Sequence, residues 1–391
     1  AKDGLKDGMI LKLPKEETSI SQENISVIDL EKRIENKKMK TVALMLPFRL
    51  MRNVDDSISN DQDLLKRDPT LRVALDFYSG ALMAAEFAKD NGISVTLNVY
   101  DTEKSDSKVA SIISRNEFKN VDAVIGPLLQ KNVEKASNML KDEKIPVFSP
   151  LSNREMAMND NLFQTLPTDA VLQKTMIHYL KEHSAGKNIF IISDSKRVKQ
   201  KEMIQTAIPT AKTVSPRGGG YIQASDITAV ASEGMENWVN LESENPILVS
   251  SAVNVLSAMP NNYKMRLFTL NKNDAYEWHE VSSMRLAKLN FTFPSVNKNI
   301  NPEDRIPFLI SYKNKYGVLP NRYAIRGFDV TYDVLLRLAA EKDIYDAIMP
   351  EGETVYIENK FRYEKSKTEG YCNQAAYILK YNADLKFEVV E

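Results

Sequence analysis

The sequence predicts an α/β protein made of two doubly wound lobes, each with a largely parallel sheet covered by helices. Three observations predict this class. Short, continuously apolar segments alternate with helical segments, the alternation restarts after residue 160, and most apolar segments end in Pro, Gly or Asp. The length of 391 residues allows two or three domains. We therefore expect a ligand cleft between the lobes, at the carboxyl ends of their strands.

The first lobe is predicted from residue 40 onward. Its strands are expected to be buried on both faces, because each is a short apolar run between polar segments. The expected strands are 40–47, 93–102, 121–127 and 145–150. The expected helices between them are 71–92, 107–118 and 130–144. The helix over 71–92 ends in Asn91-Gly92, a common way to terminate a helix.

The second lobe follows the same rhythm from residue 161 to about residue 293. A helix over 170–186 leads to the first of its strands. The expected strands are 187–194, 211–216, 245–251, 264–271 and 286–294. A long helix over 321–342 and a β-rich tail over 354–390 close the chain.

The charge balance excludes bulk attraction to nucleic acid or to anionic lipid. Lys and Arg together number 52 and Asp and Glu number 53, a formal net charge of −1. The single cysteine, Cys372, cannot form an intrachain disulfide, which leaves both cytosol and periplasm open. No apolar run is long enough to cross a bilayer.

The residue inventory argues against an enzyme, a metal site or a cofactor. His178 and His183 are five residues apart and His279 stands alone, so none shows the spacing of a zinc pair. No activating base is evident around Cys372. The glycines of 216–221 follow a strand but open no helix, so we interpret them as a loop rather than a phosphate-binding turn.

Several segments, in order along the chain, resemble the type I periplasmic-binding-protein superfamily, in particular its Leu/Ile/Val receptors. They include VDAVIGPLLQ (121–130), IPVFSPLSN (145–153) and KNIFIISD (187–194). Within that superfamily, LMLPF (44–48) and its neighbours look most like envelope proteins of Bacteroidota that carry LysM repeats. The resemblance implies a non-enzymatic solute-binding or ligand-sensing protein of the periplasm or cell envelope. It leaves open whether the full-length protein is a lipoprotein.

The resemblance also implies a domain organisation. Residues 1–39 would be a partial LysM tail and linker, since Gly8–Pro14 is similar to the closing strand of a LysM repeat. A chance match in an N-terminal arm is the alternative. A full-length LysM region would bind peptidoglycan. Residues 40–160 plus 295–350 would form the N-terminal lobe, and residues 161–294 plus 351–391 the C-terminal lobe.

The resemblance places ligand-binding candidates in the first lobe at two turns. In related receptors, a Ser at the Gln130 position and hydroxyls near Ser149 hold the ligand's carboxylate. Here the first turn presents Leu129 and Gln130, and the second presents Ser149, Ser152 and Asn153.

In the second lobe the candidates are Asp194, Ser251 and Asn271. Asp194 stands where receptors carry an acid, but the Tyr-Gly that usually follows is missing. Ser251 ends the expected strand 245–251, and Asn271 stands near the place where an acid would hold the ligand's ammonium. Because a buried zwitterion needs a charged partner at each end, a free amino acid is not the expected ligand.

Two function hypotheses stay open. The first is a receptor for a small polar molecule or a muropeptide. The second is a module that contacts another envelope protein and regulates cell-wall synthesis, as activators of peptidoglycan synthases do, with a degenerate cleft. The loop over 48–70 follows the first strand, so it could cap the cleft in either case.

Overall fold

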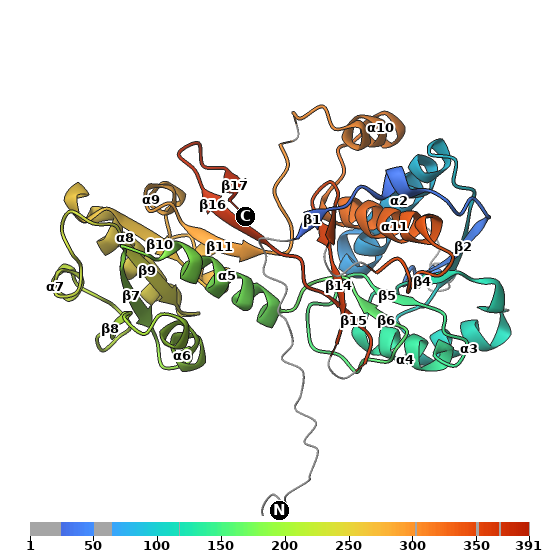
Figure 1. The fold of residues 1–391 in the computed structure, drawn as a ribbon. Coiled ribbons are helices and arrows are strands. Elements are labelled where there is room, and N and C mark those ends of the chain that lie inside the picture. Colours follow the sequence, from blue (N-terminus) through green and yellow to red (C-terminus); the bar gives the residue numbers. More distant parts are fainter. Residues whose placement is uncertain are drawn as a thin grey trace, which may run out of the picture.

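The computed structural model describes residues 25–50, 65–116, 118–301, 303–348, 352–366 and 369–390. They form two lobes, each built on a seven-stranded sheet with helices (Figure 1). The predicted α/β class with two lobes is confirmed. The expected LysM fragment and most of the loop over 48–70 lie outside the described residues.

The first sheet has the strand order β14-β15-β6-β5-β4-β2-β3. Its strands are β2 (Lys40–Leu46), β3 (Val95–Asp101), β4 (Ala123–Ile125), β5 (Val147–Ser149), β6 (Leu162–Gln164), β14 (Tyr363–Lys365) and β15 (Tyr371–Asn373). All neighbours pair in parallel except β14, which is antiparallel to β15. The accompanying helices are α2 (Pro69–Asp90), α3 (Asp106–Arg115), α4 (Gln130–Leu140), α10 (Pro307–Tyr316) and α11 (Arg322–Ala340).

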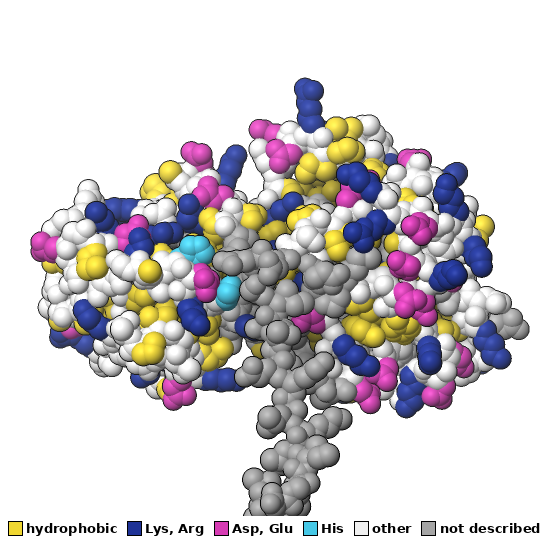
Figure 2. All heavy atoms as spheres, viewed as in Figure 1, with side chains coloured by type: hydrophobic (Ala, Val, Ile, Leu, Met, Phe, Trp, Pro, Cys, Tyr) yellow, Lys and Arg dark blue, Asp and Glu magenta, His cyan; other side chains and the backbone are white. Residues whose placement is uncertain are grey.

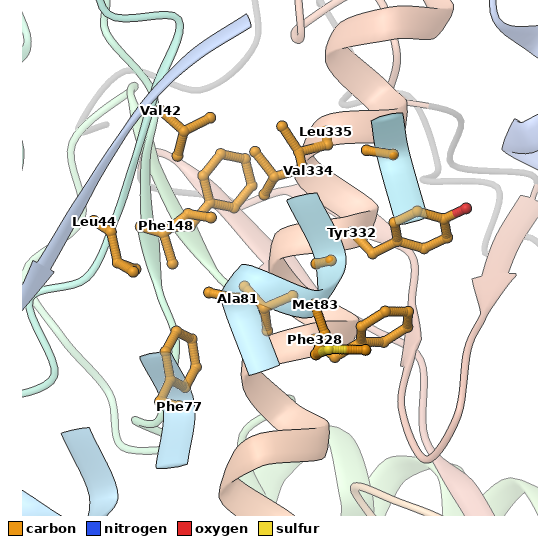
Figure 3. Close-up of a cluster of buried hydrophobic side chains, with 14 of the residues drawn as sticks. Val42, Leu44, Phe77, Ala81, Met83, Phe148, Phe328, Tyr332, Val334 and Leu335 are labelled. Atoms are coloured by element: carbon orange, nitrogen blue, oxygen red, sulfur yellow. The ribbon is translucent and has the colours of Figure 1, made fainter. Parts of the chain in front are cut away.

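The alternation of side chains along β2 explains why helices cover both faces of this sheet. Val42 and Leu44 pack against α2 and α11, and Figure 3 shows this cluster with Phe77 and Phe328. Met45 points to the opposite face, in a second cluster with residues of α3 and α4. A strand buried on both faces is apolar throughout, as the sequence of 40–47 predicted.

Two glycines allow α2 and α11 to cross in close contact. A Cβ atom on Gly80 would lie 1.8 Å from the carbonyl oxygen of Ala324. A Cβ atom on Gly327 would lie 2.1 Å from the carbonyl oxygen of Phe77. Because no carbon atom fits at such distances, this crossing requires glycine at both positions.

The second sheet has the order β17-β16-β11-β10-β9-β7-β8. Its strands are β7 (Asn188–Ser193), β8 (Lys212–Val214), β9 (Asn237–Glu242), β10 (Met265–Phe268), β11 (Thr292–Ser295), β16 (Tyr377–Tyr381) and β17 (Phe387–Val389). Its helices are α5 (Asp169–His183), α6 (Val198–Ala207), α7 (Ala224–Thr228), α8 (Pro246–Ala258) and α9 (Ser283–Lys288). β16 and β17 are antiparallel to their neighbours and close one edge.

The expected strand 286–294 starts too early, because residues 286–288 belong to α9 and the strand itself is β11. Another strand prediction in this lobe is wrong. The expected strand 245–251 is the start of α8, and the strand lies just before it, as β9. Asn245 accepts the backbone N–H of Ile247 and Pro246 occupies the first turn, which together start a helix. β9 was not predicted because two of its buried residues, Asn237 and Asn240, are polar and interrupt the apolar run expected of a buried strand.

The chain passes between the two sheets at 165–168, 296–306 and 374–376. The expectation that residues 351–391 all belong to the second lobe is corrected by the strand pairing. β15 pairs with β6 of the first sheet, and only β16 and β17 join the second. The expected start of the second lobe at residue 161 is corrected as well, because β6 pairs with β5 in the first sheet. A small sheet of β1 (Ser26–Val27), β12 (Gly352–Val355) and β13 (Lys360–Phe361) completes the described strands.

The surface fits the balanced composition. On the face shown in Figure 2, basic and acidic side chains are interspersed over both lobes. Among the described helices, none is long and apolar enough to cross a membrane.

Candidate functional site

The carboxyl ends of the parallel strands lie beside the segments that join the lobes. β6 ends at Gln164 and leads directly into the crossing at 165–168, and β11 ends at Ser295 before the crossing at 296–306. Because neighbouring parallel strands end at the same edge, the turns after β4 and β5 share the edge of β6. Those after β7, β9 and β10 share the edge of β11 in the same way. We call the side of a sheet on which its parallel strands end the carboxyl edge, or simply the edge, of that sheet. The carboxyl edges of the two sheets are the candidate functional site.

A pocket of about 870 Å³ opens at the edge of the first sheet. It lies between the first turns of α3 and α4, which follow β3 and β4. The sequence-predicted Leu129 and Gln130 line it. Sequence reasoning missed Lys104, Asn132 and Arg154, which also line it, because no local motif marks them.

Gln130 is held by the protein itself. Its side-chain amide donates hydrogen bonds to Glu134 Oε1 at 2.9 Å and to the carbonyl of Glu155 at 2.8 Å. Leu129, the residue before the helix, is 40% exposed. The turn therefore presents an apolar side chain and a side-chain amide that is already hydrogen-bonded within the protein. Related receptors are expected to present a hydroxyl at this position.

The second predicted turn contains one buried hydroxyl without a partner and two side chains that form long hydrogen bonds within the protein. Ser149 is fully buried at the end of β5, and its hydroxyl has no hydrogen-bond partner. Ser152 is half-buried and accepts a long bond of 3.4 Å from the Arg154 N–H. The Asn153 side chain donates to Asp169 Oδ1 at 3.3 Å, which links this turn to the start of α5.

Arg326 connects three segments behind this edge. It is buried in α11 and donates to the carbonyl oxygen of Pro150 at 3.0 Å, to Thr165 Oγ1 at 2.6 Å and to Asn359 Oδ1 at 2.6 Å. Burial lowers the pKa of its guanidinium to about 10, so the group keeps its charge at neutral pH. One side chain thus holds the turn after β5, the crossing at 165–168 and the segment before β13.

In the second lobe, two predicted residues lie at the edge and one does not. Asp194 follows β7 and accepts hydrogen bonds from the Ser243 hydroxyl at 2.5 Å and from the Lys196 N–H at 2.8 Å. Asn271 follows β10, and its N–H donates to Thr269 Oγ1 at 3.3 Å.

The predicted position of Ser251 at the end of a strand is wrong. It lies in the middle of α8 rather than at a strand end, because the segment 245–251 begins a helix. Its hydroxyl accepts from the Ile222 N–H at 3.1 Å and donates to the Ile222 carbonyl at 3.3 Å. Ser251 therefore connects α8 to the segment before α7.

Glu242, the last residue of β9, is a buried carboxyl group that sequence reasoning missed. Its Oε1 accepts the Leu270 N–H at 2.7 Å, and burial raises its pKa to about 8. The group is mostly protonated at neutral pH. A prediction of β9 from the sequence would have placed Glu242, its last residue, at this edge.

Apolar side chains are exposed at the same edge of the second lobe. Ile247, in the first turn of the helix after β9, is 58% exposed, and Trp278, in the segment after β10, is 44% exposed. The edge therefore combines internally bonded polar groups with accessible apolar surface.

The described residues contain no group of His, Cys, Asp and Glu that could hold a metal ion. Cys372 is half-buried in β15, and burial raises the pKa of its thiol. A thiol with a raised pKa is a poor nucleophile at neutral pH.

Comparison with known proteins supports the assignment of the fold. Residues 73–223 match the family model described as periplasmic binding protein. A putative branched-chain amino acid ABC transporter from Rhodospirillum rubrum has a similar structure, with a TM-score of 0.57 and 13% sequence identity over 90% of this chain and 100% of that chain. A branched-chain amino acid ABC transporter periplasmic ligand-binding protein from Burkholderia xenovorans gives 0.51 and 10% over 90% and 94%. No curated protein sequence matches the chain. At these identities the likeness shows the fold.

Proposed function

We propose that this chain, which has the two-lobed fold of the type I periplasmic binding proteins, is a non-enzymatic solute-binding or ligand-sensing protein of the cell envelope. The observation that carries the proposal is the pocket of about 870 Å³ at the carboxyl edge of the first sheet. Such edges are where open α/β sheets bind ligands, and the volume is that of a small-molecule site. A small polar molecule or a muropeptide fits this size.

A free branched-chain amino acid is a poor candidate, although the similar structures are named for that class. An ammonium group needs an accessible carboxylate. At the second edge, Asp194 already accepts two hydrogen bonds, and Glu242 is buried with a raised pKa. Neither of these two carboxyl groups is therefore free to pair with a ligand's ammonium group.

The proposal includes a location and a tether. A chain with this fold would act in the periplasm or at the cell envelope. The similarity of Gly8–Pro14 to a LysM closing strand suggests attachment to peptidoglycan through a full-length LysM region.

A specific observation favours the alternative, a protein-interaction module that regulates cell-wall synthesis. The edge of the second lobe exposes Ile247 and Trp278 while its polar groups are bonded internally. An accessible aromatic side chain beside an aliphatic one is a common feature of protein interfaces.

Thermal-shift screening of the chain against amino acids, sugars and muropeptides separates the two. A ligand at 100 times its Kd stabilises the folded state by about 2.7 kcal/mol, which raises the Tm by several degrees. Leu129→Glu at the pocket should abolish the shift. Leu319→Glu is the matched control, because Leu319 is 43% exposed in the same lobe and does not line the pocket.

The receptor proposal fails if no compound shifts the Tm while a pull-down from envelope extract returns a peptidoglycan synthase. That outcome would support the interaction module.

A further inference from the structure

The two seven-stranded sheets have four edge strands, and one of them differs from the other three. β8, β14 and β17 have three residues each, and they contain Lys212, Glu364 with Lys365, and Glu388, respectively. Short edge strands that carry charges discourage pairing with another chain. β3 has seven residues, Val95–Asp101, of which the first six are uncharged and none is proline. Its register against β2 is continuous, so no bulge interrupts it, and β3 lacks the usual protection of an edge.

The outer side of β3 carries free backbone groups. At one end of its ladder with β2, the Lys40 N–H donates to the Ser94 carbonyl at 2.8 Å. At the other end, the Thr102 N–H donates to the Leu46 carbonyl at 2.9 Å. Because backbone groups point to alternate sides along a strand, the even-numbered residues of 94–102 bond to β2 and the odd-numbered ones point outward. Within the described residues, the N–H and carbonyl groups of the odd-numbered residues of β3 have no hydrogen-bond partner.

The outer side of β3 is also accessible. Thr96 is exposed, and Val99 is 40% exposed. The charged residue of the strand, Asp101, is its last, and its carboxylate accepts the N–H groups of Arg49 at 2.9 Å and Leu50 at 2.8 Å. In Figure 1, β14 and β15 lie nearer the second lobe than β2 does, and β3 follows β2 in the sheet. A chain that pairs with β3 would therefore extend the first sheet away from the second lobe.

The outward residues of β3 are complementary to a second copy of themselves. They are Val95, Leu97, Val99 and Asp101, placed symmetrically about Asn98. A second copy related by a twofold axis at Asn98 would run antiparallel to the first. Leu97 would lie opposite Val99 of the second copy, and Val95 opposite its Asp101. Each strand supplies four donors and four acceptors, so the pairing forms eight hydrogen bonds, with apolar side chains at the centre and no like charges opposite each other.

We propose that β3 is a self-association surface, at which two copies of this chain pair antiparallel about a twofold axis at Asn98 and join their first-lobe sheets into one. The occupant is a second copy because this register satisfies every outward group of both strands. The twofold symmetry also closes the assembly at two copies, since neither β3 edge remains open. The association uses no residue that lines the pocket of the first lobe, so it does not depend on the proposed solute-binding function.

Sedimentation velocity measures the association without any ligand. At about 100 µM the chain should sediment mainly as a species of twice the 44.3 kDa of one copy, and dilution should return it to one copy. Val99→Pro removes an outward N–H but no hydrogen bond to β2, so the variant should still fold. It should weaken the dimer at least tenfold.

Val99→Lys gives a second perturbation in case the proline variant does not fold. It places two like charges on either side of the twofold axis and should also weaken the dimer at least tenfold. Val318→Lys is the matched control. Val318 is 62% exposed in the same lobe, after α10, and the same added charge there should leave the dimer unchanged.

Introduced cysteines test the register. The only native cysteine is removed by Cys372→Ser. In that background, Asn98→Cys places two thiols opposite each other across the axis, with Cα atoms about 4.5 Å apart, within the range that a disulfide spans. Thr96→Cys is the control, because its two copies are separated by about 13 Å along the strands. Mild oxidation should therefore crosslink Asn98→Cys and not Thr96→Cys.

Three results would overturn the inference. The first is a chain that stays monomeric at about 100 µM. The second is a dimer that neither Val99 variant weakens, or that Val318→Lys weakens equally, because its interface would then lie elsewhere. The third is a dimer that crosslinks through Thr96→Cys and not through Asn98→Cys. None of these results bears on whether the chain binds a solute.

Discussion

Replacing Glu242 by glutamine is expected to stabilise the protein, and to do so more strongly as the pH rises. Burial at the end of β9 raises the pKa of this carboxyl from 4.5 to about 8. The folded protein therefore keeps a proton that the unfolded chain releases between these two values. Because the folded state binds more protons in this window, its stability falls as the pH rises through it.

The magnitude follows from the shift. Each pH unit between 4.5 and 8 removes about 1.4 kcal/mol, so the carboxyl destabilises the fold by about 3 kcal/mol at pH 7 and by about 5 kcal/mol above pH 8. Glutamine has no proton to release. Its carbonyl oxygen can still accept the Leu270 N–H that Glu242 Oε1 accepts at 2.7 Å.

Urea unfolding at pH 5, 7 and 9 measures the effect, with the fluorescence of the buried Trp238 as the signal. The difference in unfolding free energy between Glu242→Gln and wild type should be small at pH 5 and largest at pH 9. Glu202→Gln, at an exposed position of α6, is the control and should change the free energy by less than about 0.5 kcal/mol. A difference that stays constant from pH 5 to 9 would refute the reasoning.

Three further outcomes are expected. Arg326→Met leaves three buried acceptors without their donor and should lower the unfolding free energy in urea by about 3 kcal/mol; a loss below 1 kcal/mol would contradict this role. Gly327→Ala would place a Cβ 2.1 Å from the Phe77 carbonyl oxygen and should cost at least about 2 kcal/mol in thermal unfolding, whereas Gly218→Ala, which meets open space, should change little. Ser149→Ala removes a buried hydroxyl that has no partner and should leave stability unchanged or raise it by about 1 kcal/mol. Ligand affinity, measured by calorimetry, should be unaffected by Ser149→Ala, and a loss would place this hydroxyl in the binding site.

The candidate site was only partly predictable. The pattern of 121–130 located the turn after β4, and Leu129 and Gln130 line the pocket there. The sequence could not show that the Gln130 amide is bonded to Glu134 and to the Glu155 carbonyl, since the second partner lies 25 residues away. Arg154 was missed for the same reason, because a loop from another part of the chain brings it to the pocket.

By itself, the sequence determined the architecture of this protein. A strand buried on both faces must be apolar throughout, so a run such as 40–47 can be recognised in the sequence. The alternation of such strands with helices then implies parallel sheets. Tertiary structure decided what depends on partners distant in sequence. β9 tolerates a buried Asn237 because that side chain bonds to Asn188 and to the carbonyl of Ser232, and segment 352–373 joins the first lobe because β15 finds its partner in β6. Hydrogen bonds and charges act over a few ångströms of space, whatever the separation along the chain.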